Sequence, residues 1–166
     1  MAQALFITRE DLVKFTALNG NIDTDRFIQW IKVAQDIHIQ NYLGTKLFKK
    51  INDGIVAGNL ADPYLTLLNV YIKPMTIHWS MVEFLPFSAY TFAGKGVFKH
   101  TSENAQNVDK EEIDFLIEKE RSLAENYTRR FIDYMSFHQS SFPEYYTNAN
   151  EDIFPDKDSA FLGWYL

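Results

Sequence analysis

Apolar positions recur at helical spacing through most of this chain. The first clear example begins near Asp23 or Thr24, where apolar side chains at i, i+3, i+4 and i+7 predict an amphipathic helix. Its predicted face consists of Phe27, Trp30, Ile31, Ala34, Ile37 and Asn41, widened by Ile28, Ile39 and Tyr42. Gly44 stands where a left-handed residue would end that helix. Shorter helices are expected over 9–18, after a Thr8/Asp11 capping box, and over 45–57.

The most apolar stretch runs from Asp62-Pro63 to Phe87. An acid followed by proline is a typical helix start, because the N–H that proline lacks would have no helical partner there. Pro74 lies inside this stretch, and a proline in a helix interior removes a hydrogen bond and clashes with the preceding turn. We therefore expect a kink or break at Ile72-Lys73, with Pro74 opening a central core helix after it. Its expected core residues are Met75, Ile77, His78, Trp79, Met81, Val82 and Leu85.

The longest helical pattern covers about thirty residues, from Asp109 to His138. Asp109 and Glu112 form a second capping box at its start. One apolar face is expected along it, made of Ile113, Leu116, Ile117, Leu123, Ala124, Tyr127, Phe131, Tyr134 and Met135. Before this helix, residues 88–102 lose the helical period. Two short β runs around a glycine-rich turn predict a hairpin there, which is only marginally stable alone.

The chain ends in an acidic, proline-broken tail that is rich in aromatic residues. Disordered tails are usually poor in aromatics, because nothing in such a tail buries them. The rings of this tail are Phe142, Tyr145, Tyr146, Phe154, Phe161, Trp164 and Tyr165. We therefore predict that the tail binds a surface on another polypeptide. The alternative, that the rings fold back on the chain's own body, stays open.

Together these patterns predict a mainly α fold. We expect a helical bundle with one long C-terminal helix, a small β-hairpin or loop insertion and an extended C-terminal arm. The expected body covers residues 1–142, with the hairpin or loop at about 88–102, and the arm covers residues 143–166. With 166 residues, the chain is long enough for one domain with a substantial core.

Composition narrows the classes of function. The formal net charge of −6 disfavours non-specific binding to nucleic acid or anionic lipid, since phosphate binding needs clustered Lys and Arg. The absence of cysteine removes disulfides and thiolate zinc sites. No apolar run approaches the ~20 residues of a membrane span, and Met1 to Thr8 lacks the pattern of a secretory signal. We expect a soluble protein, made inside the cell, without a membrane partner.

No spacing of residues predicts catalysis. His38 has no second histidine or carboxylate at i+4, and His78 lies five residues before Glu83, a spacing that does not place two ligands on one helical face. A packed or hydrogen-bonded His78 beside Trp79 is the simpler interpretation. No zinc-protease, calcium-loop or phosphate-loop motif occurs. We therefore expect neither an enzyme nor a cofactor.

Two charged clusters invite a functional interpretation. Three acids share one helical face, but acids in the first turns of a helix are favoured by the helix dipole alone, so no metal site is predicted. These acids are Glu111, Asp114 and Glu118. The hairpin carries the local basic cluster, which could face DNA phosphates or be a solvated turn. From the residues alone the solvated turn is favoured. This cluster consists of Lys95, Lys99 and His100 around Gly96.

A succession of short motifs resembles one family along nearly the whole chain. The motifs are Tyr42-Leu43-Gly44-Thr45-Lys46-Leu47, Tyr71-Ile72-Lys73-Pro74 through Trp79, Glu83-Phe84-Leu85-Pro86-Phe87, Gly96-Val97 with Thr101-Ser102-Glu103-Asn104, Phe142-Pro143-Glu144-Tyr145 and Gly163-Trp164-Tyr165-Leu166. In this order they resemble head–tail connector (adaptor) proteins of tailed bacteriophages, and most of all the neck ring proteins of crAss-like phages. The match rests on their succession, since no single motif is diagnostic.

The resemblance implies a structural virion protein rather than an enzyme. Such a subunit forms a ring, typically a dodecamer, at the portal vertex, where it joins head to tail and extends the channel through which double-stranded DNA passes. The implied partners are other copies of the chain, the portal protein and other neck or tail proteins. The implied location is the neck of the virion, after assembly in the host cytoplasm.

The resemblance also implies where partners bind. In related adaptors a C-terminal segment grips the portal, and residues 154–166 match it here. Buried aromatic side chains often anchor protein interfaces. The expected protein-interface residues are therefore Phe154, Phe161, Trp164, Tyr165, Leu166, Tyr145 and Tyr146. The family's loop before the last helix matches residues 90–100, with Lys95, Gly96, Lys99 and His100 as candidate lumen or neighbour contacts. Two alternatives remain: a non-catalytic helical interaction or regulatory domain, and a small helical enzyme or metalloprotein.

Overall fold

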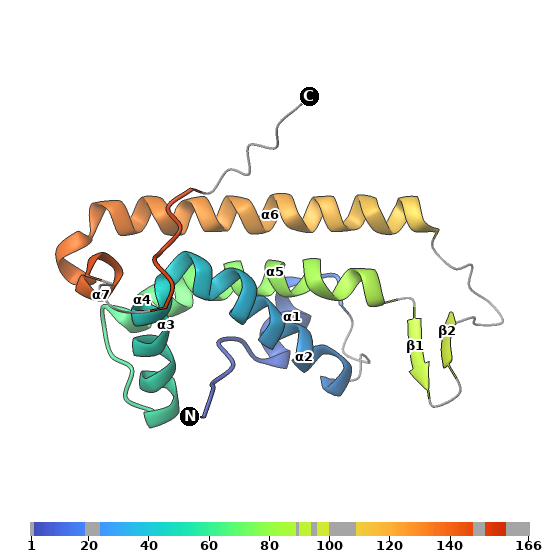
Figure 1. Ribbon diagram of the computed structural model, residues 1–166, viewed down its shortest axis with the longest axis horizontal. Helices are drawn as coiled ribbons and strands as arrows, with labels where there is room; N and C mark the ends of the chain where they lie inside the picture. Colours follow the sequence, from blue (N-terminus) through green and yellow to red (C-terminus); the bar gives the residue numbers. More distant parts are fainter. Residues whose placement is uncertain are drawn as a thin grey trace.

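The helices pack around one buried central helix, α5 (Figure 1). The computed structural model describes residues 2–18, 24–88, 90–93, 96–99, 109–147 and 152–158. The elements are α1 (Arg9–Phe15), α2 (Thr24–Ala34), α3 (Gln40–Ala57), α4 (Tyr64–Leu67), α5 (Lys73–Phe84), β1 (Tyr90–Ala93), β2 (Gly96–Lys99), α6 (Lys110–Phe137) and α7 (Pro143–Tyr146). Two π-helical turns, Gln35–Ile39 and Leu68–Ile72, and two 3₁₀ turns, Leu85–Phe87 and Gln139–Ser141, join some of them.

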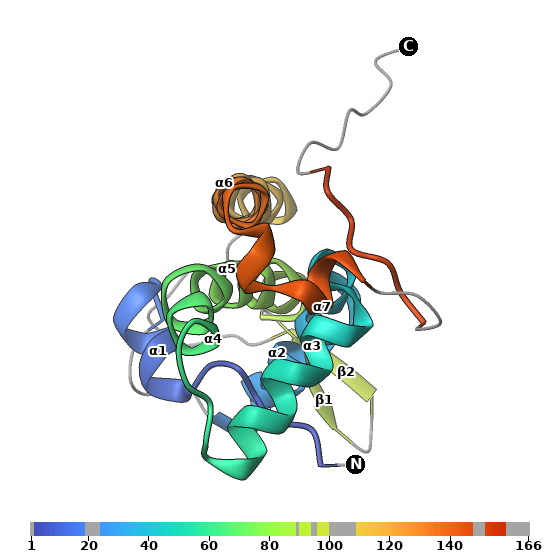
Figure 2. The same cartoon turned by 90° about the vertical axis from the view of Figure 1, so that its left-hand side faces the viewer.

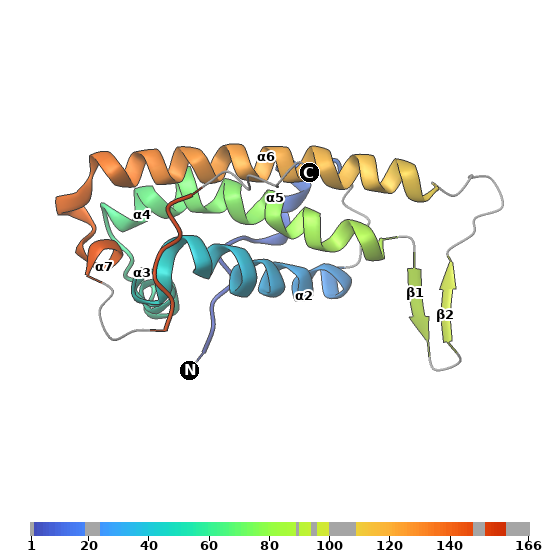
Figure 3. The same ribbon diagram turned by 45° about the horizontal axis from the view of Figure 1, so that its top comes forward.

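α5 is buried because helices cover it on opposite sides. α6 lies along one side of it and α2 along the other (Figures 1 and 3). Its buried residues are Met75, Thr76, Ile77, His78, Trp79, Ser80, Met81, Val82 and Phe84. The indole N–H of Trp79 donates to Oγ1 of Thr128 on α6 at 3.1 Å, so even the polar atom of this large ring has a partner. The predicted central core helix is confirmed, except that Leu85 is only half-buried.

The π turn at Gln35–Ile39 shifts the register between α2 and α3. A π turn adds a residue to the helical turn, so the side chains after it move around the axis. Ile37, which we expected in the apolar face, is 57% exposed, whereas Gln35 is buried. The Gln35 side chain accepts from the Phe6 N–H at 2.7 Å and donates to the Ala4 carbonyl at 3.0 Å. The predicted placement of Ile37 in the apolar face is therefore wrong, because the π turn places the hydrogen-bonded Gln35 side chain on the buried side instead.

The second π turn accommodates Pro74. The Lys73 N–H donates to the Leu68 carbonyl, so the hydrogen-bond pattern changes one residue before the proline. Pro74 then lies in the first turn of α5, where its missing N–H is tolerated. The chain thus stays helical through Ile72-Lys73, where we expected a kink or break, and only the helix type changes there.

Both predicted capping boxes are formed. The Thr8 hydroxyl accepts from the Asp11 N–H at 3.3 Å while the Asp11 carboxylate accepts from the Thr8 N–H at 2.9 Å. At α6, Asp109 and Glu112 exchange the same pair of bonds, at 2.9 and 3.1 Å. These caps fix the starts of α1 and α6 within one residue of the positions that the sequence indicates.

α6 is buried unevenly along its length. Ala124, Phe131 and Met135 are fully buried, but Leu116 and Leu123 of the predicted face are each 45% exposed. Phe115, beside them, is 60% exposed. The face of nine apolar residues that we expected is thus confirmed only in part. The apolar face that the sequence predicts for α6 is larger than the part of that face that the other helices cover.

The mainly α fold, with its long C-terminal helix, is confirmed. The hairpin projects from the end of the bundle, with Tyr90 opposite Lys99 and Ala93 opposite Gly96 (Figures 1 and 3). Residues 143–146 form α7, which packs against α3, so this part of the expected arm belongs to the body. Residues 152–158 have no regular secondary structure and run over α3 as an extended segment (Figure 2).

Candidate functional site

The arm docks where Gly44 interrupts α3. Gly44 has φ 72° and ψ 154°, so the positive φ that we expected is present. The ψ value lies outside the left-handed helical region, and α3 continues past Gly44 after a kink instead of ending there. A side chain at this position would be strained, and its Cβ would lie 2.7 Å from the ring of Pro155. The interruption therefore needs glycine for two reasons: backbone conformation and the close approach of the arm.

The arm replaces the helical hydrogen bond that the kink removes. In an unbroken helix the Thr45 N–H would donate to the Asn41 carbonyl. Here the Thr45 N–H donates to the Ile153 carbonyl at 3.0 Å, and the Asn41 carbonyl accepts from the Asp156 N–H at 2.9 Å. Asn41, Gly44 and Thr45 thus form a docking position for an extended segment, which we call the seat.

Side chains complete the seat without covering the arm. The Thr45 hydroxyl accepts from the Ile153 N–H at 3.0 Å. The Lys157 ammonium lies 5.0 Å from the ring centroid of Tyr146 and 5.6 Å from that of Tyr145, a cation–π arrangement. Phe154, between the bound residues, is 68% exposed. The seat holds the arm by its backbone and directs its largest described side chain to the outside.

The predicted interface rings divide into three groups. Tyr145 is 2% exposed and packs edge-on against Phe131 at 5.9 Å, and Tyr146 is half-buried with its hydroxyl donating to the Met135 carbonyl. Burial raises the pKa of both phenols. These two rings fold back on the body, which is the alternative that the sequence left open. They do so because α7 places Tyr145 and Tyr146 in contact with α6. Phe154 faces outward. The remaining predicted rings and the last residue lie outside the described residues: Phe161, Trp164, Tyr165 and Leu166.

The candidate loop residues are described only in part. Lys95 and His100 lie outside the described residues, whereas Gly96 and Lys99 are the ends of β2. The Arg26 guanidinium donates to the Tyr90 carbonyl at 2.9 Å and links α2 to the root of the hairpin. The hairpin is thus held at its base.

Two histidine–glutamate pairs clasp α5 to its neighbours. Nε2 of His38 lies 2.7 Å from Oε1 of Glu83, and Nδ1 of His78 lies 2.7 Å from Oε2 of Glu120. The His38 ring also stacks on Trp79, with centroids 3.9 Å apart. Burial lowers the pKa of His38, and the nearby carboxylate of Glu83 opposes that effect only in part.

The spacing of residues in the sequence could not predict these pairs, because the two members of each pair lie 45 and 42 residues apart in the chain. The packed, hydrogen-bonded His78 that we favoured is confirmed. Within the described residues, which include Glu111, Asp114 and Glu118, no three His, Cys, Asp or Glu side chains come together in an arrangement that could hold a metal ion. No helix in the described parts of the chain is both long enough and apolar enough to cross a bilayer.

Comparison with known proteins gives one match. Residues 39–155 match a family of unknown function, DUF6712. The matched segment begins at Ile39, just before the seat, and ends at Pro155, which lies on Gly44. No curated protein and no solved structure matches the chain.

Proposed function

The chain belongs to this family of unknown function, and we propose from its own features that it is a structural virion protein. In this proposal, copies of the chain form a ring at the portal vertex of a tailed phage. The ring joins head to tail and extends the channel through which DNA passes.

The main observation behind the proposal is that the arm is bound to the seat with an aromatic side chain exposed. Residues 153 and 156 are fixed by backbone hydrogen bonds to Thr45 and Asn41. Phe154 between them is exposed. An isolated domain gains little from holding an apolar ring in water, whereas aromatic side chains are the commonest anchors of protein interfaces. The arm has the form of a segment that presents anchors to a partner.

Two further surfaces suit assembly. The N-terminal half of α6 exposes Phe115, Leu116 and Leu123, and the hairpin projects from the bundle with Val97 exposed. A ring subunit needs different surfaces on its two sides, because head-to-tail contacts join unlike patches. These features lie at the opposite end of α6 from α7 (Figure 1).

The resemblance to connector proteins supplies the identity of the partners. Its motifs follow one another along nearly the whole chain, from Tyr42 to Leu166. We assign the portal to the arm beyond the seat, including Phe161, Trp164 and Tyr165. The hairpin then faces the lumen or the next copy. The net charge of −6 is compatible with a channel through which DNA slides without adhering.

Electron microscopy of the purified protein with its portal tests the proposal. We expect a closed ring of this chain on the portal, with one arm per copy in contact with it. A soluble monomer without portal is compatible with the proposal, since such rings order on docking. A chain that stays monomeric in the presence of portal contradicts it.

A pair of truncations separates the arm from the body. Removal of residues 148–166 leaves α7 and its buried Tyr145 in place, so we expect an intact helical circular dichroism spectrum and loss of portal binding. Removal from residue 143 onward also takes Tyr145 out of the core, so we expect reduced stability as well. Full portal binding by the shorter truncation would contradict the role of the arm.

A further inference from the structure

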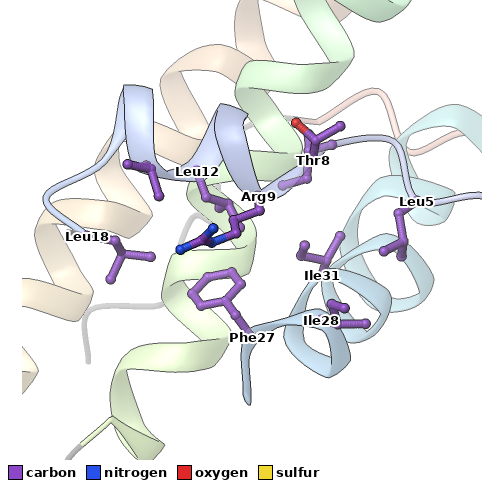
Figure 4. A pocket seen from close by; sticks show the side chains of 10 residues that line it. Leu5, Thr8, Arg9, Leu12, Leu18, Phe27, Ile28 and Ile31 are labelled. Atoms are coloured by element: carbon purple, nitrogen blue, oxygen red, sulfur yellow. The ribbon is translucent and has the colours of Figure 1, made fainter. Parts of the chain in front are cut away.

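A small apolar pocket opens between α1 and α2 (Figure 4). Its volume is about 110 Å³. Ile7, Leu12, Phe27 and Ile31 are buried around it. The remaining lining residues include the exposed Leu5 and Ile28 and the charged Arg9, labelled in Figure 4.

The pocket has the size and lining of a site for one aromatic ring. A cavity of about 150 Å³ lined by Leu, Ile and Phe stays dry and binds benzene. A pocket of 110 Å³ that is open to the surface takes the outer part of a phenyl ring. Filling it buries apolar surface on both sides, which is the arrangement of interface hot spots.

The chain itself offers such a ring on the arm. Phe154 is exposed between two residues that the seat holds, so its position is fixed before any partner arrives. The described arm, residues 152–158, contains three aspartates and one lysine, so it is negative overall, whereas Arg9 is the charged residue among those that line the pocket. The size of the ring and the net charge of the arm therefore suit the pocket.

One copy cannot join its own arm to its own pocket. The arm lies over α3 and beside α7, whereas α1 lies on the far side of the bundle (Figure 2). The bonds at residues 153 and 156 hold Phe154 on the α3 side. Contact between these two features requires a second copy, and it joins unlike patches, which is the geometry of rings and filaments.

We propose that Phe154 of one copy inserts into the α1–α2 pocket of a second copy, with Arg9 beside the acids of the arm. This inference deepens the proposed function and rests on it for the closure of these contacts into a ring. It divides the tail into two parts: residues 152–158 link neighbouring copies, and the residues beyond them remain for the portal.

Photo-crosslinking tests the contact directly. The small photoreactive residue p-azidophenylalanine replaces Phe154 in one preparation, which is mixed with isotopically labelled wild-type protein and irradiated. We expect crosslinks between copies that mass spectrometry maps to residues 5–31. The matched control places the same group at Phe137, which is more exposed than Phe154 but lies on α6. Crosslinks from position 154 that miss the pocket, or that equal those from position 137, overturn the inference.

Self-association gives an independent measurement. The inference requires the wild-type protein to self-associate at high concentration even without portal, and a wild type that stays monomeric there overturns it. Phe154→Ala removes the aromatic side chain, and we expect the association constant in sedimentation velocity to fall about 30-fold or more. Ile28→Glu at the pocket should have a similar effect, whereas Ile37→Glu, an exposed isoleucine outside the pocket, should have none. Equal effects of the two glutamate variants overturn the inference, because they indicate a loss that does not depend on the pocket.

The two proposals fail separately. A ring on the portal in which position 154 does not crosslink to the pocket overturns the contact and leaves the connector function standing. Crosslinked copies that never assemble on the portal leave the contact standing and overturn the connector function.

Discussion

The two halves of α6 are similar in sequence pattern and different in surroundings. Between Ala124 and Met135, the side chains of Ala124, Phe131 and Met135 are fully buried against the body, and Thr128 accepts a hydrogen bond from the indole of Trp79. Toward the N-terminus, Phe115 and Leu123 of the same helix face solvent. An amphipathic pattern therefore indicates that a helix has an apolar face, but not that the chain itself covers it. In the proposed ring, this uncovered half is the part of α6 that would contact a neighbouring protein.

The largest expected effect is in the covered half. Phe131→Ala should lower the free energy of unfolding by about 3–5 kcal/mol, because a fully buried ring is replaced by a cavity. Urea denaturation followed by circular dichroism measures it. Phe137→Ala on the same helix, at an exposed position, should change stability by less than about 0.5 kcal/mol. Similar losses for the two variants would show that burial does not distinguish these positions.

Removal of the Thr128 hydroxyl tests the polar contact inside the covered half. Thr128→Val keeps the shape of the side chain but leaves the Trp79 N–H buried without its partner, so we expect a loss of about 1–3 kcal/mol. Thr128→Ser retains the hydroxyl and should recover the part of the loss that is due to the hydrogen bond. Tryptophan fluorescence during denaturation reports both. A valine variant as stable as the wild type would rule out a stabilising role for this bond.

The capping box at the start of α6, in the half of the helix that the body leaves uncovered, should contribute less to stability. Asp109→Ala removes the acceptor for the Glu112 N–H, so we expect a loss of about 1 kcal/mol. Backbone carbon chemical shifts should show fraying in the first turn of α6 and no change around Phe131. Asp109→Asn keeps a capping oxygen and is the control. Fraying that extends to Phe131 would mean that the two halves fold as one unit.

The smallest effect on stability is expected on the open face itself. Phe115→Ser combined with Leu123→Ser should change the free energy of unfolding by less than about 0.5 kcal/mol per position, since both side chains are already exposed. Ring formation on the portal, seen by electron microscopy, should be lost. A large loss of stability in the isolated chain would show that this face is covered after all.

Local signals in the sequence predicted the helices well. The capping pairs Thr8/Asp11 and Asp109/Glu112 and the proline at position 74 each act within a few residues, so their structural consequences can be derived from the sequence. The π turn at residues 35–39 could not be derived, because it depends on the bonds of Gln35 to the segment around Ala4 and Phe6. A distant partner decided which side of this helix is buried.

The candidate site was predictable only in its parts. The sequence indicates the positive φ of Gly44, which the structure confirms. It also indicates Phe154 as an interface residue; the structure shows that this ring is exposed, and its role as an anchor stays a prediction. That Pro155 lies on Gly44 involves residues more than a hundred positions apart, and no local pattern encodes such a pairing. The burial of Tyr145 has the same cause, since Phe131 on α6 provides its contact.

The exchange of one helical bond for two bonds to the arm has a practical consequence. When the arm leaves the seat, the Thr45 amide proton loses its acceptor and the Asn41 carbonyl loses its donor. The Thr45 amide should then exchange with deuterium from solvent. The fraction of occupied seats could thus be counted from a single resonance in the middle of α3, in the free protein and during assembly alike.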